Sequence, residues 1–256
     1  MKKKLNILIS NDDGYNSSGL LELSTALQAL GDVTIVAPKN QQSGVSSSLT
    51  FISPLMAYEK ILSNNVKCII IDGTPADCVK LAISKLLDTK PDIVVSGINH
   101  GRNTAINILY SGTVGAAIEG YLLGIPSIAV SINNHFHSEY LKDAAELTRD
   151  IVVDYLLKDG LKTTPFLNIN IPDLPRDQIK GIKFTKIANT RWDELYEKRT
   201  APYGWDYYWF AGKFEYKEND MNTDDGALSN DYISITPLKI DFFDEYTYNF
   251  YNSETK

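Results

Sequence analysis

Residues 5–38 read LNILISNDDGYNSSGLLELSTALQALGDVTIVAP, and this stretch decides the fold. It opens with a short apolar run that ends in Asn-Asp-Asp-Gly, which is typical of a buried strand feeding a loop. Leucine and alanine then recur at helical spacing over residues 18–30, and the run VTIVA at 33–37 predicts a second strand. Strand, helix and strand in this order predict a βαβ unit, whose two strands are parallel.

The same alternation continues along the chain. Further short β-branched runs predict strands at 66–71, 92–96, 126–132 and 166–171. Helical patterns lie between them, beginning at Pro75, at residues 113–123 and at residues 139–158. The expected fold class is therefore α/β: a doubly wound, Rossmann-like, mostly parallel sheet between two layers of helices.

The pattern changes after about residue 180. Residues 182–217 are strand-like and rich in Tyr and Trp, which predicts an antiparallel β-hairpin arm. Residues 218–231 are acidic and polar, and a loop is expected there, before the strand-like run at 232–236. The expected organisation is an α/β core over 1–180, followed at 181–256 by the aromatic arm and its return to the core, in one domain overall.

Composition narrows the class of protein. The chain has 256 residues, 43% of them hydrophobic, and a formal charge of −7, which indicates a globular protein and disfavours a duplex nucleic-acid binder. Two cysteines are too few for a disulfide framework. The apolar run after Lys2-Lys3-Lys4 is too short for a signal peptide, and no window is long enough to span a bilayer. We therefore expect a cytoplasmic protein without a membrane partner.

Ligands of a doubly wound sheet bind at the carboxyl ends of its strands, and Asp12 and Asp13 follow the first strand directly. Two adjacent acids repel each other unless a cation lies between them. The alternative is a helix-capping acid pair in which Gly14 makes the turn. Ser43 after the second strand and Asn99 after residues 92–96 would complete a set of oxygen ligands, which suits Mg²⁺, Mn²⁺ or Ca²⁺ better than zinc.

Ser111-Gly112-Thr113 stand at the start of a predicted helix, where free backbone N–H groups attract an anion such as phosphate. An ordinary Ser or Thr helix cap is the simpler interpretation. Neither a Gly-Lys-Ser/Thr phosphate loop nor a Gly-x-Ser-x-Gly elbow is formed here. His135 and His137 lack further ligands at zinc-like spacing, and the Trp and Tyr cluster suits packing or a subunit interface better than base stacking.

Five motifs in a fixed order resemble the SurE family of nucleotidases, from about residue 5 to 238. They are Asn11-Asp12-Asp13-Gly14, Ala37-Pro38 with Ser43-Gly44, Gly73-Thr74-Pro75-Ala76-Asp77, Ser96-Gly97-Ile98-Asn99 with Gly101 and Asn103, and Tyr110-Ser111-Gly112-Thr113. None of these motifs is specific by itself, but their order is.

The resemblance implies a metal-dependent phosphatase that hydrolyses nucleoside monophosphates. It implies one divalent cation per subunit, Mg²⁺ or Mn²⁺, held by Asp12, Asp13, Ser43 and Asn99. Asp12 and Asn99 would be catalytic, and the phosphate would be held by Asn103, Ser111, Gly112 and Thr113. Family members form dimers or tetramers, so the aromatic arm is expected to join a homodimer or homotetramer.

Two positions depart from the family pattern. Gln42 stands where Arg often precedes the metal-binding Ser, and Ser47 stands where some members have His. Both changes remove positive charge near a phosphate. The alternatives are a broad-specificity acid phosphatase or polyphosphatase, a nucleotide-binding protein without catalysis, and a Mg²⁺-binding regulatory phospho-acceptor. The last would use Asp72, but the strand at 166–171 is not followed by the lysine that it requires.

Overall fold

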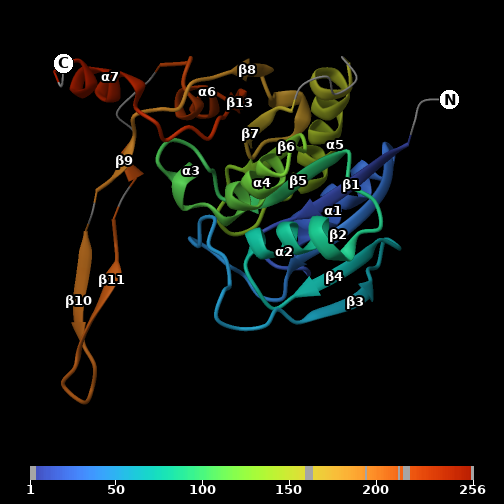
Figure 1. The fold of residues 1–256 in the computed structure, drawn as a ribbon, viewed down its shortest axis with the longest axis horizontal. Helices are drawn as coiled ribbons and strands as arrows, with labels where there is room; N and C mark the ends of the chain where they lie inside the picture. Colours follow the sequence, from blue (N-terminus) through green and yellow to red (C-terminus); the bar gives the residue numbers. More distant parts are fainter. Residues whose placement is uncertain (1–3, 159–163, 194, 213, 216–219, 255–256) are drawn as a thin grey trace.

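A computed structural model describes residues 4–158, 164–193, 195–212, 214–215 and 220–254. Its centre is a nine-stranded sheet in the order β3-β4-β2-β1-β5-β6-β7-β13-β8 (Figure 1). The strands are β1 (Leu5–Ser10), β2 (Gly31–Pro38), β3 (Ala57–Ile61), β4 (Lys67–Ile71), β5 (Ile93–His100), β6 (Ser127–Ile132), β7 (Phe166–Ile171), β8 (Ile182–Phe184) and β13 (Ile233–Pro237). All neighbours are parallel except the pairs β3–β4 and β7–β13. The predicted doubly wound, mostly parallel sheet is confirmed.

Helices cover both faces of this sheet. They are α1 (Ser18–Leu27), α2 (Pro75–Leu81), α3 (Asn107–Tyr110), α4 (Gly112–Leu122), α5 (Leu141–Ile151), α6 (Asp224–Ser229) and α7 (Glu245–Glu254). The π-helical segments η1 (Ala82–Leu86) and η2 (Val152–Leu157) continue α2 and α5, and η3 (Arg176–Gln178) is a short 3-10 turn. Helices α1 and α5 pack together on one face, and α2 and α4 pack together on the other.

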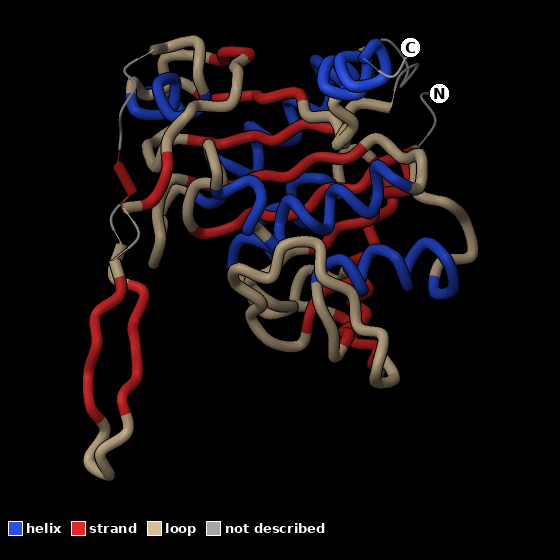
Figure 2. The backbone as a smooth tube through the Cα atoms, turned by 60° about the vertical axis from the view of Figure 1, so that its left-hand side comes forward, coloured by secondary structure: helices blue, strands red, loops and turns tan. Residues whose placement is uncertain are grey.

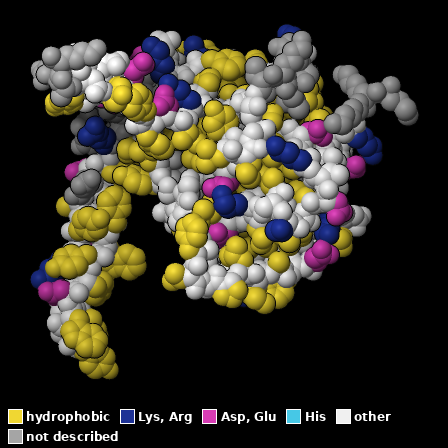
Figure 3. Space-filling view, viewed as in Figure 1, with side chains coloured by type: hydrophobic (Ala, Val, Ile, Leu, Met, Phe, Trp, Pro, Cys, Tyr) yellow, Lys and Arg dark blue, Asp and Glu magenta, His cyan; other side chains and the backbone are white. Residues whose placement is uncertain are grey.

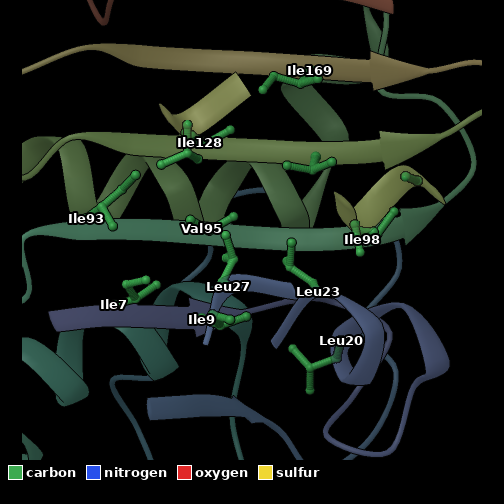
Figure 4. Packing of buried hydrophobic residues seen from close by; sticks show 14 of the residues in the cluster. Ile7, Ile9, Leu20, Leu23, Leu27, Ile93, Val95, Ile98, Ile128 and Ile169 are labelled. Carbon is green, nitrogen blue, oxygen red and sulfur yellow. The ribbon is translucent and has the colours of Figure 1, made fainter. Parts of the chain in front are cut away.

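Alternate residues of β1 show why the sheet is buried on both sides. Ile7 and Ile9 pack in the cluster that contains Leu20 and Leu23 of α1 (Figure 4). Leu8 packs instead with residues of α2 and α4. Successive side chains of a strand point to opposite faces, so a continuous apolar run fits a sheet that is covered twice. The carboxyl ends of the strands are left as the edge where polar loops gather.

Local signals fix where three of the helices begin. The Ser17 side chain accepts a hydrogen bond from the Leu20 N–H at the start of α1. Thr74 and Asp77 form a reciprocal capping box around the first turn of α2. Ser111 accepts from the Val114 N–H at 3.1 Å and caps α4. The N-terminal ends of these helices lie within two residues of where the sequence pattern predicts them.

The predicted hairpin is also present, and it extends away from the body of the molecule (Figure 2). Its strands β10 (Tyr196–Thr200) and β11 (Asp206–Phe210) form a two-stranded sheet of their own among the described strands. At its base, β9 (Arg191–Trp192) pairs with β12 (Phe214–Glu215). The space-filling view shows apolar side chains recurring along the arm, which stands clear of the body in this view (Figure 3).

The expectation of a loop over residues 218–231 is wrong for its second half, where α6 forms. Thr223 caps the helix by accepting from the Gly226 N–H, and Asp224 and Asp225 are only 0% and 1% exposed. These acids were taken for solvated loop residues because their hydrogen-bond donors come from distant segments. Residues 218–219 of that range lie outside the described part of the chain.

The sequence pattern did not predict three further elements: β3, α3 and α7. β3 is an exposed edge strand, α3 is a single short turn, and α7 is a polar and aromatic helix. Within the described ranges, no helix combines the length and apolar character needed to cross a membrane.

Candidate functional site

The loops after β1 and β2 and the start of α4 meet at Asp12. Its Oδ1 accepts a hydrogen bond of 2.5 Å from the Thr113 hydroxyl, and its backbone carbonyl accepts one of 2.7 Å from the Gln42 N–H. Thr113 is 101 residues away in sequence, in the first turn of α4. A carboxylate that is only 5% exposed is thereby placed against the positive end of a helix.

Gly112 permits this close approach. A Cβ atom at this position would lie 2.9 Å from the Asp12 Cβ and 3.1 Å from the Gln42 carbonyl oxygen. Any side chain would therefore push the helix start away from Asp12. The Ser-Gly-Thr sequence thus has a geometric reason beyond capping, since only glycine lets the helix terminus and the acid share this space.

Asp13 faces the end of β5. Its Oδ2 accepts from the His100 N–H at 3.2 Å and lies 3.3 Å from the His100 Nδ1. On its other side, the Gln41 side-chain nitrogen lies 3.4 Å from Asp13 Oδ1 and 3.0 Å from Ser43 Oγ. Gln41 and His100 were missed as site residues, although His100 directly follows Asn99 and Gln41 stands two residues before Ser43 in the sequence.

Asn99 occupies the carboxyl end of β5, one residue before His100. Its side-chain nitrogen donates to the Gly101 carbonyl at 2.5 Å, which leaves Oδ1 as the ligand atom of the amide. The β5–β6 register shifts between Ser96 and Asn99, and the Gly97–Ile98 peptide bond is cis. The structure thus gathers seven of the eight predicted site residues at one edge of the sheet: Asp12, Asp13, Ser43, Asn99, Ser111, Gly112 and Thr113.

The eighth, Asn103, is held by a different set of polar groups. Its side chain donates to Ser131 Oγ at 2.8 Å, and its N–H donates to Asn170 Oδ1 at 2.8 Å. Its carbonyl accepts from Asn168 at 2.7 Å. These bonds run to β6 and β7 and not to Asp12 or the start of α4. Asn103 is therefore buried beneath the loop that follows β5.

Burial sets the proton affinity of Asp12. It raises the pKa of this carboxyl to about 6; the Thr113 hydrogen bond lowers it, and the negative charge of Asp13 raises it. A cation between the two carboxylates would relieve both the desolvation and the repulsion. The oxygen chemistry of the set therefore fits a hard divalent cation.

The carboxylates alone do not make a complete metal site. Over the residues that the structure describes, no three His, Cys, Asp or Glu side chains are grouped so that they could hold a metal ion. A cation at Asp12 and Asp13 would need neutral oxygen ligands as well, and Ser43 and Asn99 are the candidates on neighbouring loops.

A second buried polar cluster holds the loop after β5, and sequence reasoning missed it. Asp224 accepts from the Ala105 N–H at 2.9 Å and from the Ala188 N–H at 2.8 Å. Asp225 accepts from the Thr104 hydroxyl at 2.5 Å and lies 3.8 Å from the Arg102 guanidinium. Burial raises the pKa of Asp224 and lowers that of Arg102. The sequence Thr223-Asp224-Asp225 could have indicated this helix, because Thr is a favoured N-cap residue and acids are favoured in the first turn.

The fold and the site define a doubly wound α/β protein with paired carboxylates opposite a helix N-terminus at the carboxyl edge of its sheet. Comparison with known proteins makes the assignment specific. The model of the family described as "Survival protein SurE" matches residues 7–194, and the chain belongs to this family.

Similar proteins extend the match to nearly the whole chain. A protein named "5'-nucleotidase SurE" from Christiangramia forsetii is 41% identical and covers 94% of this chain and 93% of its own. A protein of the same name from Chlorobaculum tepidum is 40% identical, over 94% and 91%. A structure titled "Crystal Structure of Sure Protein from Aquifex aeolicus" superposes with a TM-score of 0.84 at 40% identity, covering 98% and 100%.

Proposed function

We propose that this protein is a divalent-metal-dependent phosphatase that hydrolyses nucleoside monophosphates to nucleoside and phosphate. The single observation that carries the proposal is the hydrogen bond between Asp12 and Thr113, which joins a buried carboxylate to a helix N-terminus. Full-length similarity to proteins named 5'-nucleotidase SurE supports the same substrate class. The broad-specificity phosphatase, phospho-acceptor and non-catalytic alternatives are less favoured by that similarity.

In this proposal Asp12, Asp13, Ser43 and Asn99 hold one divalent cation per subunit, Mg²⁺ or Mn²⁺. When bound, such a cation neutralises phosphate oxygens and lowers the pKa of a coordinated water. His100 and Gln41 orient Asp13 and Ser43 through the contacts described above. Because Gln41 donates to both Asp13 and Ser43, it sets the spacing of two proposed ligands.

The phosphate would lie at the start of α4. There the first N–H groups of the helix and the Ser111 hydroxyl bind and orient the phosphate oxygens. Thr113 donates its proton to Asp12 Oδ1, so its hydroxyl oxygen keeps lone pairs only, and backbone N–H groups supply the donors. Asn103 would contribute to the phosphate site by holding the loop after β5 in position. Asp12 and Asn99 are the proposed catalytic residues.

The arm is proposed to assemble a homodimer or homotetramer. Its aromatic side chains are exposed in the single chain, with Tyr203 at 86% and Trp205 at 75%. A two-stranded hairpin is marginal by itself, so burial against a second copy would supply the missing stability. We also propose that residues 1–180 and 181–256 function as one unit, in the cytoplasm.

Steady phosphate release tests the enzymatic proposal. Purified protein is assayed with AMP, GMP, CMP and UMP in Mg²⁺ or Mn²⁺, before and after chelation. Turnover that chelator abolishes and added metal restores is expected. An inactive Asp12→Asn protein that keeps its fold is the matched control, and absence of turnover with every metal and ester would overturn the proposal.

A further inference from the structure

A pocket lies next to the proposed phosphate site and has no role in the mechanism above. It has a volume of about 220 Å³ and lies between the α3 region and the segment that leads into β9. One wall includes Ala105, Ile106 and Leu109, and the other runs from Ile187 to Arg191. The first wall is apolar, and the second combines Ile187 and Ala188 with the polar groups of Asn189, Thr190 and Arg191.

The chain itself connects this pocket to the phosphate site. Ala105 stands two residues after Asn103, and Leu109 stands two residues before Ser111. Two residues of chain span at most about 7 Å. The wall at 105–109 is therefore the segment between the proposed phosphate residues, and a ligand held there by its phosphate reaches the pocket with its organic part.

The two walls are held in fixed positions. Asp224 accepts from the Ala105 N–H on one wall and from the Ala188 N–H on the other, at 2.9 and 2.8 Å. Trp192, which follows the second wall directly, donates from its indole nitrogen to Asn107 Oδ1 at 2.7 Å. These bonds tie the two walls to each other, so the pocket exists before any ligand binds and costs little to organise.

An unsatisfied polar atom points to a polar ligand group. Thr190 lines the pocket and is 1% exposed, and its Oγ1 has no hydrogen-bond partner among the described residues. A buried hydroxyl without a partner is unfavourable unless a ligand supplies one. Hydroxyl and amide groups both donate and accept, so Thr190 and Asn189 suit heterocycles with different edge patterns.

We infer that this pocket is the nucleobase subsite of the enzyme, which rests on the proposed function. The planar base lies between the apolar walls formed by Ile106, Leu109 and Ile187, with its polar edge toward Thr190 and Asn189. Because the polar groups are adaptable, the subsite favours nucleotides over base-free phosphate esters more than it discriminates among bases.

The test compares AMP with ribose 5-phosphate, which has the same phosphate and sugar but no base. Thr190→Val removes a hydroxyl that has no hydrogen-bond partner in the described part of the chain, and Leu109→Ala trims a side chain that is 59% exposed, so neither change threatens folding. In each variant, the ratio of kcat/KM for AMP to that for ribose 5-phosphate is expected to fall about fivefold or more. Ile61→Ala, at an exposed position on the edge strand β3, is the control and keeps the ratio.

Adenosine provides a readout that does not depend on turnover. Its inhibition constant is expected to rise in Thr190→Val and Leu109→Ala by a factor similar to the fall in the ratio, and to stay constant in Ile61→Ala. Equal changes for AMP and ribose 5-phosphate would overturn the base subsite while leaving the phosphatase intact. If the variants dissociate the oligomer but keep the ratio of kcat/KM for AMP to that for ribose 5-phosphate, the base subsite is overturned. The pocket would then hold a side chain of a second subunit. Wild-type protein that is inactive on every ester would instead overturn the proposed function.

Discussion

The carboxyl edge of the sheet and the hairpin arm differ in where their side chains find partners. At the carboxyl edge, Asp12 is 5% exposed and is bound to the loop after β2 and to the first turn of α4. On the arm, every residue of β10 and β11 is exposed, and Trp209 is 59% exposed. The edge is positioned by a core that is buried on both faces, whereas the arm pairs with itself and extends from the body (Figure 1).

This difference indicates two different roles for the side chains of the two regions. The side chains of the edge are held in place by contacts within one chain, so their arrangement is complete in the protomer. The arm carries large apolar side chains that the described part of the protomer leaves exposed, and exposed patches of this kind mark interaction surfaces. Changes at the edge should therefore alter chemistry and stability, and changes on the arm should alter assembly.

The largest expected effect follows from removing the Asp12 charge. Asp12→Asn should lower kcat by about a hundredfold or more, because the proposed cation and the phosphate site lose their central carboxylate. Phosphate release at saturating Mn²⁺ measures this. Near wild-type activity in the variant would contradict the site assignment.

The same variant should make the metal-free protein more stable at pH 8. Burial raises the pKa of Asp12 from 3.8 to about 6. A raised pKa in the folded state means that stability is fully present below the unfolded pKa and is lost as the pH rises through the folded value. Asp12→Asn avoids this loss, so at pH 8 the free energy of unfolding should rise by up to about 3 kcal/mol relative to wild type. Urea unfolding of both proteins in chelator at pH 4 and pH 8 measures this gain. The prediction is contradicted if the stability difference between variant and wild type is the same at both pH values.

The core should respond strongly to truncation. Leu23 of α1 is fully buried against the sheet (Figure 4). Leu23→Ala should lower the free energy of unfolding by about 3 kcal/mol, through lost burial and the cavity that remains. A loss below about 1 kcal/mol in urea unfolding would show that the core repacks.

The arm should respond in the opposite way. Trp209→Ala should change the unfolding of the core by less than about 0.5 kcal/mol, because the side chain is mostly exposed. It should weaken self-association about tenfold or more. Sedimentation equilibrium measures this, with Phe51→Ala, 85% exposed on the body, as the matched control. Equal association of both variants would exclude the arm as the interface.

The smallest effect is expected at a surface ion cluster. Burial alone would raise the pKa of Asp150, but hydrogen bonds from Arg149 and Arg176 outweigh it and lower that pKa. This contribution to stability is present above the ordinary pKa and is lost as the pH falls through the lowered value. Asp150→Asn should therefore cost under about 1 kcal/mol at neutral pH and nothing in strong acid. A pH-independent cost would contradict the ion-pair explanation.

Much of the fold follows from local patterns, as β1, α1 and β2 show. Apolar runs, the Ser17 cap and Pro38 predict their order and approximate ends without any long-range information. The acids of α6 show the limit of such reasoning. Asp224 and Asp225 have the composition of a solvated loop, and only contacts with Thr104, Ala105 and Ala188 bury them. No local pattern encodes partners that lie between 36 and 121 residues away.

The candidate site divides in the same way. The sequence alone predicts which residues lie at the carboxyl edge, because parallel strands end together and their loops follow in order. It does not show that Gly112 touches Asp12, that His100 binds Asp13, or that Asn103 faces Ser131. Residue types and strand order are properties of the chain. Distances between loops, and the pocket beside α3, arise only when the packed sheet fixes those loops in space, because their side chains meet across segments that share no local signal.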